Sequence, residues 1–248
     1  MSLWRMELAR LFRTWRWLGL AASYVAFGVL GPVITRYQEA LFGNLGGEIT
    51  VVVPPPSAPQ AVASFTGNAA QIGLIVTIFI AAGSIAFDAR PEWAAFLRTR
   101  VMVGRLVVPK VTVNAAAAIV SFTLAAAIAW VLTVVLIEDL PTAGMLAGIA
   151  YWAIYLGFAV SVVALCAGVS RSVIGTAGFT AVILLVVPIG AEVIGGLKPW
   201  MPSTLVGSLT ALAEGESSSA FVRAALVAVV AGAACLVGSV RLLSRREL

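Results

Sequence analysis

Residues 111–137 read VTVNAAAAIVSFTLAAAIAWVLTVVLI, a run of 27 residues without a charged side chain. A helix needs about 20 apolar residues to cross the hydrocarbon core of a bilayer. Its backbone amides must be satisfied within the segment, because lipid offers no hydrogen-bond partner. Strands of an outer-membrane barrel would instead alternate in polarity over about 10 residues, and the run does not alternate. It therefore predicts a transmembrane helix.

Five further apolar runs accompany this one, so we predict an all-α membrane protein with six transmembrane helices. The mean hydropathy is +1.03, and only 11% of the residues are charged. We expect a single transmembrane domain over residues 1–248, with both termini in the cytoplasm. The spans are expected at about 17–35, 69–87, 111–137, 141–170, 172–195 and 220–241.

The distribution of basic residues sets the orientation. With a cytoplasmic N-terminus and six alternating spans, 13 of the 16 Lys and Arg residues fall on the inner side. Only Arg36, Lys198 and Arg223 fall outside. This is the positive-inside bias of membrane proteins. Topology thus explains the net charge of +5, and we expect a bilayer and no nucleic acid as a partner. We predict a multi-pass protein of the cell membrane, which in bacteria is the inner membrane.

The residues before the first span predict an amphipathic helix lying in the membrane interface. At 100° per residue an apolar and a basic face separate, with tryptophans suited to headgroup depth and arginines suited to anionic lipid. The apolar face comprises Trp4, Leu8, Leu11 and Trp15, and the basic face comprises Arg5, Arg10, Arg13 and Arg16. Anchoring the first span and docking a partner remain equal alternatives for this helix.

A charged insertion, DARPEWAAFLRTRVMVGRLVVPK at 88–110, separates the second and third spans and holds seven of the chain's charged residues. A helix that starts near Pro91, a good first-turn residue, places Trp93, Phe96, Leu97 and Arg100 on one face. Such a face fits the membrane surface, and it fits a groove on a soluble partner equally well.

Other segments predict local features of the fold. The outer loop 36–68 contains Pro54, Pro55, Pro56 and Pro59, and prolines at that density argue against regular helix. The loop 195–219 has an apolar middle, which we expect to re-enter the outer leaflet against protein. Gly144 and Gly148 predict close helix packing, within the protomer or across a dimer. Pro188 predicts a kink, and a flexing fifth span is the sharper alternative.

The sequence holds no motif for catalysis within this chain. There is no GxxxxGK[ST] phosphate-binding loop, so we expect no ATP hydrolysis and no cofactor here. With no histidine, and with Cys166 and Cys235 inside predicted spans, we expect neither a metal site nor a disulfide. Glu192 is the best candidate for ion coupling, although its place near the outer end of a span favours an interfacial role.

The insertion resembles the segment between the second and third spans of type-2-class ABC exporter permeases, where a short coupling helix precedes an arginine-containing run and a closing lysine. Two further stretches are similar to that family: ALCAGVSRSVIGTA at 164–177 to its short inner turn, and KPWMPSTLVGSL at 198–209 to its outer loop. The matching positions of the insertion are Asp88, Arg90, Phe96, Leu97, Thr99, Arg100, Arg105, Leu106, Val107 and Lys110.

The resemblance implies a permease subunit that pairs with a second copy or a paralogous permease. Two separate ABC ATPase subunits would dock below and hold the ATP and Mg. The residues implied to couple to the ATPase are Glu92, Trp93, Phe96, Leu97, Arg98 and Arg100. The residues implied to face the pathway are Tyr24, Phe27, Phe179 and Leu184.

The expected function is therefore export of a hydrophobic or amphipathic compound, such as a drug, an antibiotic or a lipid-like molecule. Two other classes remain open. One is an ion- or proton-coupled secondary transporter or channel, which needs a titratable group inside the spans. The other is a non-transporting scaffold or sensor subunit, which does not need a functional face on the insertion.

Overall fold

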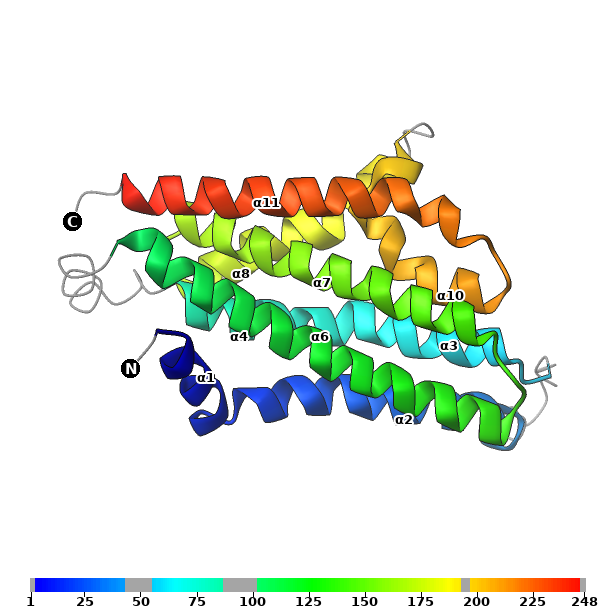
Figure 1. Ribbon diagram of the computed structural model, residues 1–248. Helices are drawn as coiled ribbons and strands as arrows, with labels where there is room; N and C mark the ends of the chain where they lie inside the picture. The colour runs from blue at the N-terminus through cyan, green and yellow to red at the C-terminus, as the bar shows by residue number, and fades with distance from the viewer. Residues whose placement is uncertain (1–2, 43–54, 87–101, 193–196, 246–248) are drawn as a thin grey trace.

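The computed structural model describes residues 3–42, 55–86, 102–192 and 197–245 (Figure 1). Within these ranges all regular structure is helical. Six helical segments are long and apolar enough to cross a membrane, which confirms the prediction of a six-span, all-α membrane protein. These segments are Arg16–Leu41, Ala58–Ile85, Val103–Leu136, Thr142–Val169, Val173–Gly190 and Ser218–Ser244.

The helices lie side by side, and α1 (Leu3–Arg13) sits at one end of the bundle (Figure 1). The end of α4, the start of α6 and the end of α11 lie at that same end, which we call the basic end (Figure 1). The first four spans are α2 (Arg16–Phe42), α3 (Ala58–Asn68) joined by a π-helical turn (Ala69–Gly73) to α4 (Leu74–Ile85), α6 (Val103–Leu136) and α7 (Thr142–Val169). The fifth is α8 (Val173–Ala181), a π-helical turn (Val182–Val186) and α9 (Val187–Glu192), and the sixth contains α11 (Val222–Ser244).

The first span continues to Phe42 and the second begins at Ala58, so the prediction that residues 36–68 form no regular helix is wrong at both ends of that stretch. Pro59 occupies the first turn of α3, where its missing N–H is not needed for an intrahelical bond. The backbone N–H of Ala58 donates instead to Glu138 Oε1 at 2.9 Å. Residues 43–54, with the first of the prolines, lie outside the described ranges.

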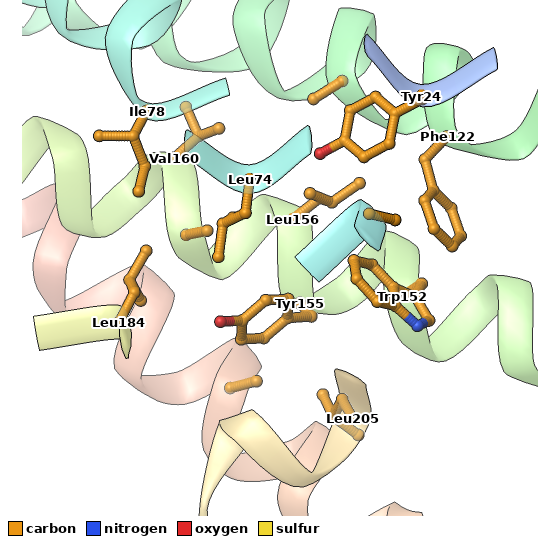
Figure 2. Packing of buried hydrophobic residues seen from close by; sticks show 14 of the residues in the cluster. Tyr24, Leu74, Ile78, Phe122, Trp152, Tyr155, Leu156, Val160, Leu184 and Leu205 are labelled. Atoms are coloured by element: carbon orange, nitrogen blue, oxygen red, sulfur yellow. The ribbon is translucent and has the colours of Figure 1, made fainter. Parts of the chain in front are cut away.

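The core is organised around α7. In the membrane-spanning stretch of α7, 67% of the residues are buried, whereas in that of the fifth span 22% are buried. Trp152 of α7 stacks on Phe122 of α6 with ring centroids 4.4 Å apart. Phe65 of α3 stacks on the same ring at 5.5 Å, and Tyr24 of α2 meets it edge-on at 5.8 Å. Figure 2 shows Tyr24, Phe122 and Trp152 in this packing. Four of the six spans are thus held together at one phenylalanine.

Tyr24 also makes a polar contact inside this core. Its hydroxyl lies 2.9 Å from Thr77 Oγ1, and Thr77 donates to the carbonyl of Gly73. Thr77 therefore accepts from the tyrosine. The absence of a side chain at Gly73 makes room for the ring, since a β-carbon there would overlap it. The hydrogen bond joins α2 to α4 across the π-helical turn.

Substitution Tyr24→Phe is expected to lower the free energy of unfolding by about 0.5–1.5 kcal/mol, because it removes the hydrogen bond and keeps the ring packing. Thermal unfolding in nanodiscs measures the change. Tyr37→Phe is the matched control, since the side chain of Tyr37 is exposed. An equal loss in both variants would contradict the assignment to the Tyr24–Thr77 bond.

The chain between the fifth and sixth spans folds back onto α7 and α3. It contains short 3₁₀ turns at Lys198–Trp200 and Pro202–Gly207, and then α10 (Ser208–Ala213). Its buried side chains are Leu205, Leu209 and Leu212. The indole N–H of Trp152 donates to the carbonyl of Val206 at 2.9 Å. Apolar burial and one side-chain hydrogen bond therefore fix this outer segment, residues 198–213, on the central helix.

Two glycines of α7 allow that approach. A β-carbon at Gly148 would lie 2.5 Å from Leu209 Cδ1 and 2.8 Å from Leu209 Cα. A β-carbon at Gly144 would lie 2.5 Å from the carbonyl oxygen of Leu212. The close packing predicted for these glycines thus occurs within the protomer, against the backbone of α10.

Candidate functional site

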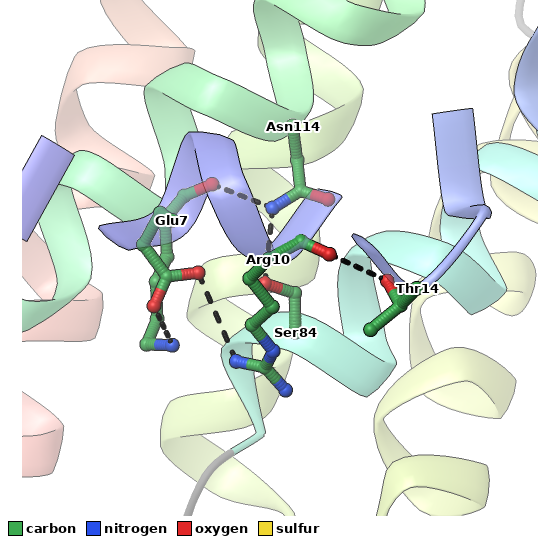
Figure 3. A network of polar contacts seen from close by, with 6 residues as sticks. Glu7, Arg10, Thr14, Ser84 and Asn114 are labelled. Carbon is green, nitrogen blue, oxygen red and sulfur yellow. Dashed lines mark hydrogen bonds and ion pairs between the residues drawn. The ribbon is translucent and has the colours of Figure 1, made fainter. Parts of the chain in front are cut away.

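A cluster of buried polar side chains lies at the basic end, where α1 meets α4 and α6 (Figure 3). We call Glu7, Arg10, Ser84, Lys110 and Asn114 the polar cluster. Polar side chains in a membrane protein are costly to bury and mark places where a defined arrangement is required. The cluster is therefore distinct in kind from the apolar core.

The centre of the cluster is an ion pair between Lys110 of α6 and Glu7 of α1. Lys110 Nζ donates to Glu7 Oε1 at 2.6 Å, and both side chains are about 5% exposed. Arg10 lies 3.7 Å from the other carboxylate oxygen and is partly exposed. Two buried charges need each other, because either alone would be left unsolvated. The pair thus fixes where α1 sits on α6.

Asn114 joins the pair to α4. Its side-chain amide donates to the carbonyl of Lys110 at 2.7 Å and to Ser84 Oγ at 3.1 Å. Ser84 lies in the last turn of α4. The amide oxygen of Asn114 is buried and accepts no hydrogen bond from the described part of the chain. The start of α6 is therefore tied both to α1 and to the end of α4.

The cluster brackets the charged insertion. The described structure stops at residue 86, just after Ser84, and resumes at residue 102, shortly before Lys110. Both flanks of that stretch are thus held by the same set of polar contacts. The implied coupling residues all lie outside the described ranges: Glu92, Trp93, Phe96, Leu97, Arg98 and Arg100.

The N-terminal helix exists, but its protein-facing side differs from the predicted apolar face. Leu11 is buried as the pattern suggests, together with Glu7 one turn earlier. Trp4 and Leu8 are about half exposed, and Trp15 lies beyond the helix in a turn with φ 57°. Arg5 and Arg13 are exposed on α1.

Sequence patterns did not single out Glu7, although a signal for it existed. It is the one acidic residue of a helix that otherwise carries only arginine charges. Lys110 was recognised by resemblance as the closing lysine of the insertion. The two lie far apart in sequence, so only the fold could pair them.

The four residues implied to face a pathway do not share one surface. Tyr24 and Leu184 are buried in the core, Phe27 is partly buried against it, and Phe179 is 55% exposed. A pathway between two protomers is built from residues that one protomer leaves exposed. Of these four, Phe179 meets that condition most fully.

The fifth span presents an apolar outer face. Besides Phe179, its exposed large side chains are Ile174, Val182, Ile183, Val186, Val187 and Ile189. The π-helical turn Val182–Val186 lies directly before Pro188, so this face changes direction near its middle. Lipid or a second protomer would cover such a surface equally well.

The described residues contain no group of His, Cys, Asp and Glu able to hold a metal ion. Cys166 is buried and Cys235 half-buried, and both are free. Glu192 is the last residue of α9, and its side chain lies outside what the structure describes.

Comparison with protein-family models, with curated proteins and with solved structures gives no match for this chain.

Proposed function

We propose that this chain is the permease subunit of an ATP-driven exporter. It pairs with a second permease, and separate ATPase subunits supply the ATP and Mg chemistry. The observation that carries the proposal is the polar cluster. The Asn114–Ser84 bond ties together the two helices that flank the charged insertion, and the buried Glu7–Lys110 pair ties them to α1. A helix pair that receives force from a soluble subunit needs such a rigid base.

The charge pattern supports this arrangement. The insertion 88–110 combines basic residues with an apolar stripe, the composition of a helix that inserts one face into a partner's groove. Movement of that helix would reach the bundle first through the end of α4 and the start of α6. The cluster ties these points to α1 as well, so the three helices would move as one body.

The exposed face of the fifth span supports the proposed substrate class. That face is apolar, and a hydrophobic or amphipathic compound is the cargo that such a surface accepts. The π-helical turn before Pro188 gives the span a place to bend. We infer further that residues 198–213 form a re-entrant external gate, because they pack back onto α7 and α3.

The deciding experiment asks whether a gene beside this one encodes an ABC ATPase and whether that ATPase co-purifies with the tagged chain, and it then measures ATP hydrolysis in nanodiscs. We expect a stable complex whose hydrolysis rises with an amphipathic substrate. Phe96→Asp is expected to lose the ATPase while inserting normally, because a charge enters the apolar stripe of the insertion.

Val169→Asp is the matched control, since Val169 is 63% exposed at the end of α7, outside both the insertion and the exposed face of the fifth span. It should keep the ATPase. Retention of the ATPase by Phe96→Asp would remove the coupling role of the insertion. Ion or proton flux through the purified chain alone would replace the proposal by a channel or secondary transporter.

A further inference from the structure

A groove of about 530 Å³ runs between α1 and the start of α6. It lies outside the polar cluster, toward the first residues of both helices. Its lining consists of Leu3, Trp4, Gly104, Arg105, Val108 and Pro109. All of these belong to described helices, so the groove is a defined feature of the fold.

The Glu7–Lys110 pair joins the two helices that line the groove. Trp4 lies one helical turn before Glu7, and Val108 lies just before Lys110. Because the 2.6 Å ion pair fixes α1 on α6, Trp4 from α1 and Val108 from α6 line the same groove. Gly104 contributes only backbone to the lining, and a β-carbon there would meet Val240 of α11 at 3.5 Å.

The chemistry of the lining suits an amphiphile with a negative headgroup. Trp4, Val108 and Pro109 offer an apolar floor, and Arg105 is exposed at the rim. Arg105 makes no ion pair within the described ranges. Tryptophan prefers headgroup depth, so the groove lies where the phosphates and the upper acyl carbons of a bilayer meet.

The surrounding charge is one-sided. Arg5, Arg13, Arg241 and Arg245 lie at the same end of the bundle as Arg105. Among the described residues of that end, the only acidic side chain is Glu7, and Lys110 already pairs with it. A basic surface of this kind attracts anionic lipid, each Lys or Arg near the bilayer adding about 1 kcal/mol.

We propose that this groove is a binding site for one anionic phospholipid of the phosphatidylglycerol type. The acyl chain lies between Trp4 and Val108, and the phosphate binds Arg105. The bound lipid covers the apolar floor and completes the contact between α1 and α6. The site goes beyond the proposed transport function, and it holds whatever the chain moves.

Native mass spectrometry of the chain tests the proposal. The protein is released from nanodiscs made of phosphatidylglycerol and phosphatidylethanolamine in about equal parts. The wild type is expected to retain phosphatidylglycerol preferentially. Arg105→Gln should retain about fivefold less, as loss of one interfacial charge predicts. Val108→Trp, which fills the groove and keeps the charge, should lose retention by at least as much, while Arg105→Lys should largely preserve it.

Arg171→Gln is the matched control, because Arg171 is exposed in the short turn between α7 and α8 and does not line the groove. It should behave as wild type. Equal retention of both lipids by the wild type, or equal loss in Arg171→Gln, would overturn the site. So would loss in Arg105→Gln with none in Val108→Trp, since general surface charge would then explain the effect. If Arg105→Gln and Val108→Trp both retained phosphatidylglycerol as the wild type does, the lipid would not bind in this groove and the proposal would be rejected.

Discussion

Lys110→Met is expected to lower the free energy that holds α1 on the bundle by about 3–5 kcal/mol, because it leaves the buried Glu7 carboxylate without its partner. Glu7 is 5% exposed, so water cannot replace the lysine without displacing the helix. Arg10 is 3.7 Å away and partly exposed, which makes it a poor substitute. Trypsin provides the measurement: the Arg13 side chain is already exposed, but release of α1 from the bundle lets the helix backbone around it unfold into the protease, and cleavage there should accelerate strongly.

A double substitution distinguishes the effect of the ion pair's charges from the effect of side-chain packing at the same positions. Glu7→Leu with Lys110→Met replaces both charges by apolar groups of similar size, which is often neutral for a buried pair. We expect cleavage at Arg13 to return close to the wild-type rate. Arg10→Met is the control, and it should lower the free energy that holds α1 by less than about 1 kcal/mol, because Arg10 is partly exposed and 3.7 Å from the carboxylate, which Lys110 still pairs. If trypsin cleaved the double variant at Arg13 as fast as it cleaves Lys110→Met, the charges of the pair would themselves be required.

The sequence predicts the spans of this protein better than it predicts where its helices begin and end. Long uncharged runs specify six helices, because lipid forces each run to satisfy its own backbone. Where a helix begins or ends depends instead on local sequence context. Pro59 reads as a helix breaker in a proline-rich loop, yet it starts α3, since a first-turn proline loses no hydrogen bond. Patterns thus locate spans well and their outer ends poorly.

Burial on one helix face was harder to predict, because every face of these spans is apolar. Periodicity separates core from surface only where the surface is polar. Tyr24 and Phe179 have similar sequence surroundings, yet Tyr24 is fully buried beside Phe122 and Phe179 is 55% exposed. The Glu7–Lys110 pair was likewise out of reach, because it depends on how α1 docks, which no local pattern encodes.

Gly148→Leu is expected to displace the outer segment from α7. The added β-carbon would lie 2.8 Å from Leu209 Cα, a backbone atom that cannot turn away as a side-chain end can. Overpacking of this kind costs about 1–3 kcal/mol and more for a large side chain. The backbone amides of α10 should therefore exchange with deuterium faster, which mass spectrometry of the peptide around 205–213 measures.

Gly157→Ala tests the same helix without the contact. Nothing lies within 4 Å of a β-carbon at Gly157, so alanine there should gain about 0.5–1 kcal/mol from helix propensity. Gly148→Ala should instead lose stability, since even one methyl group meets Leu209. Opposite signs for two glycine-to-alanine changes on α7 would establish that Gly148 is retained for the approach of α10. The same sign in both would place the constraint in α7 itself and remove the outer segment from the explanation.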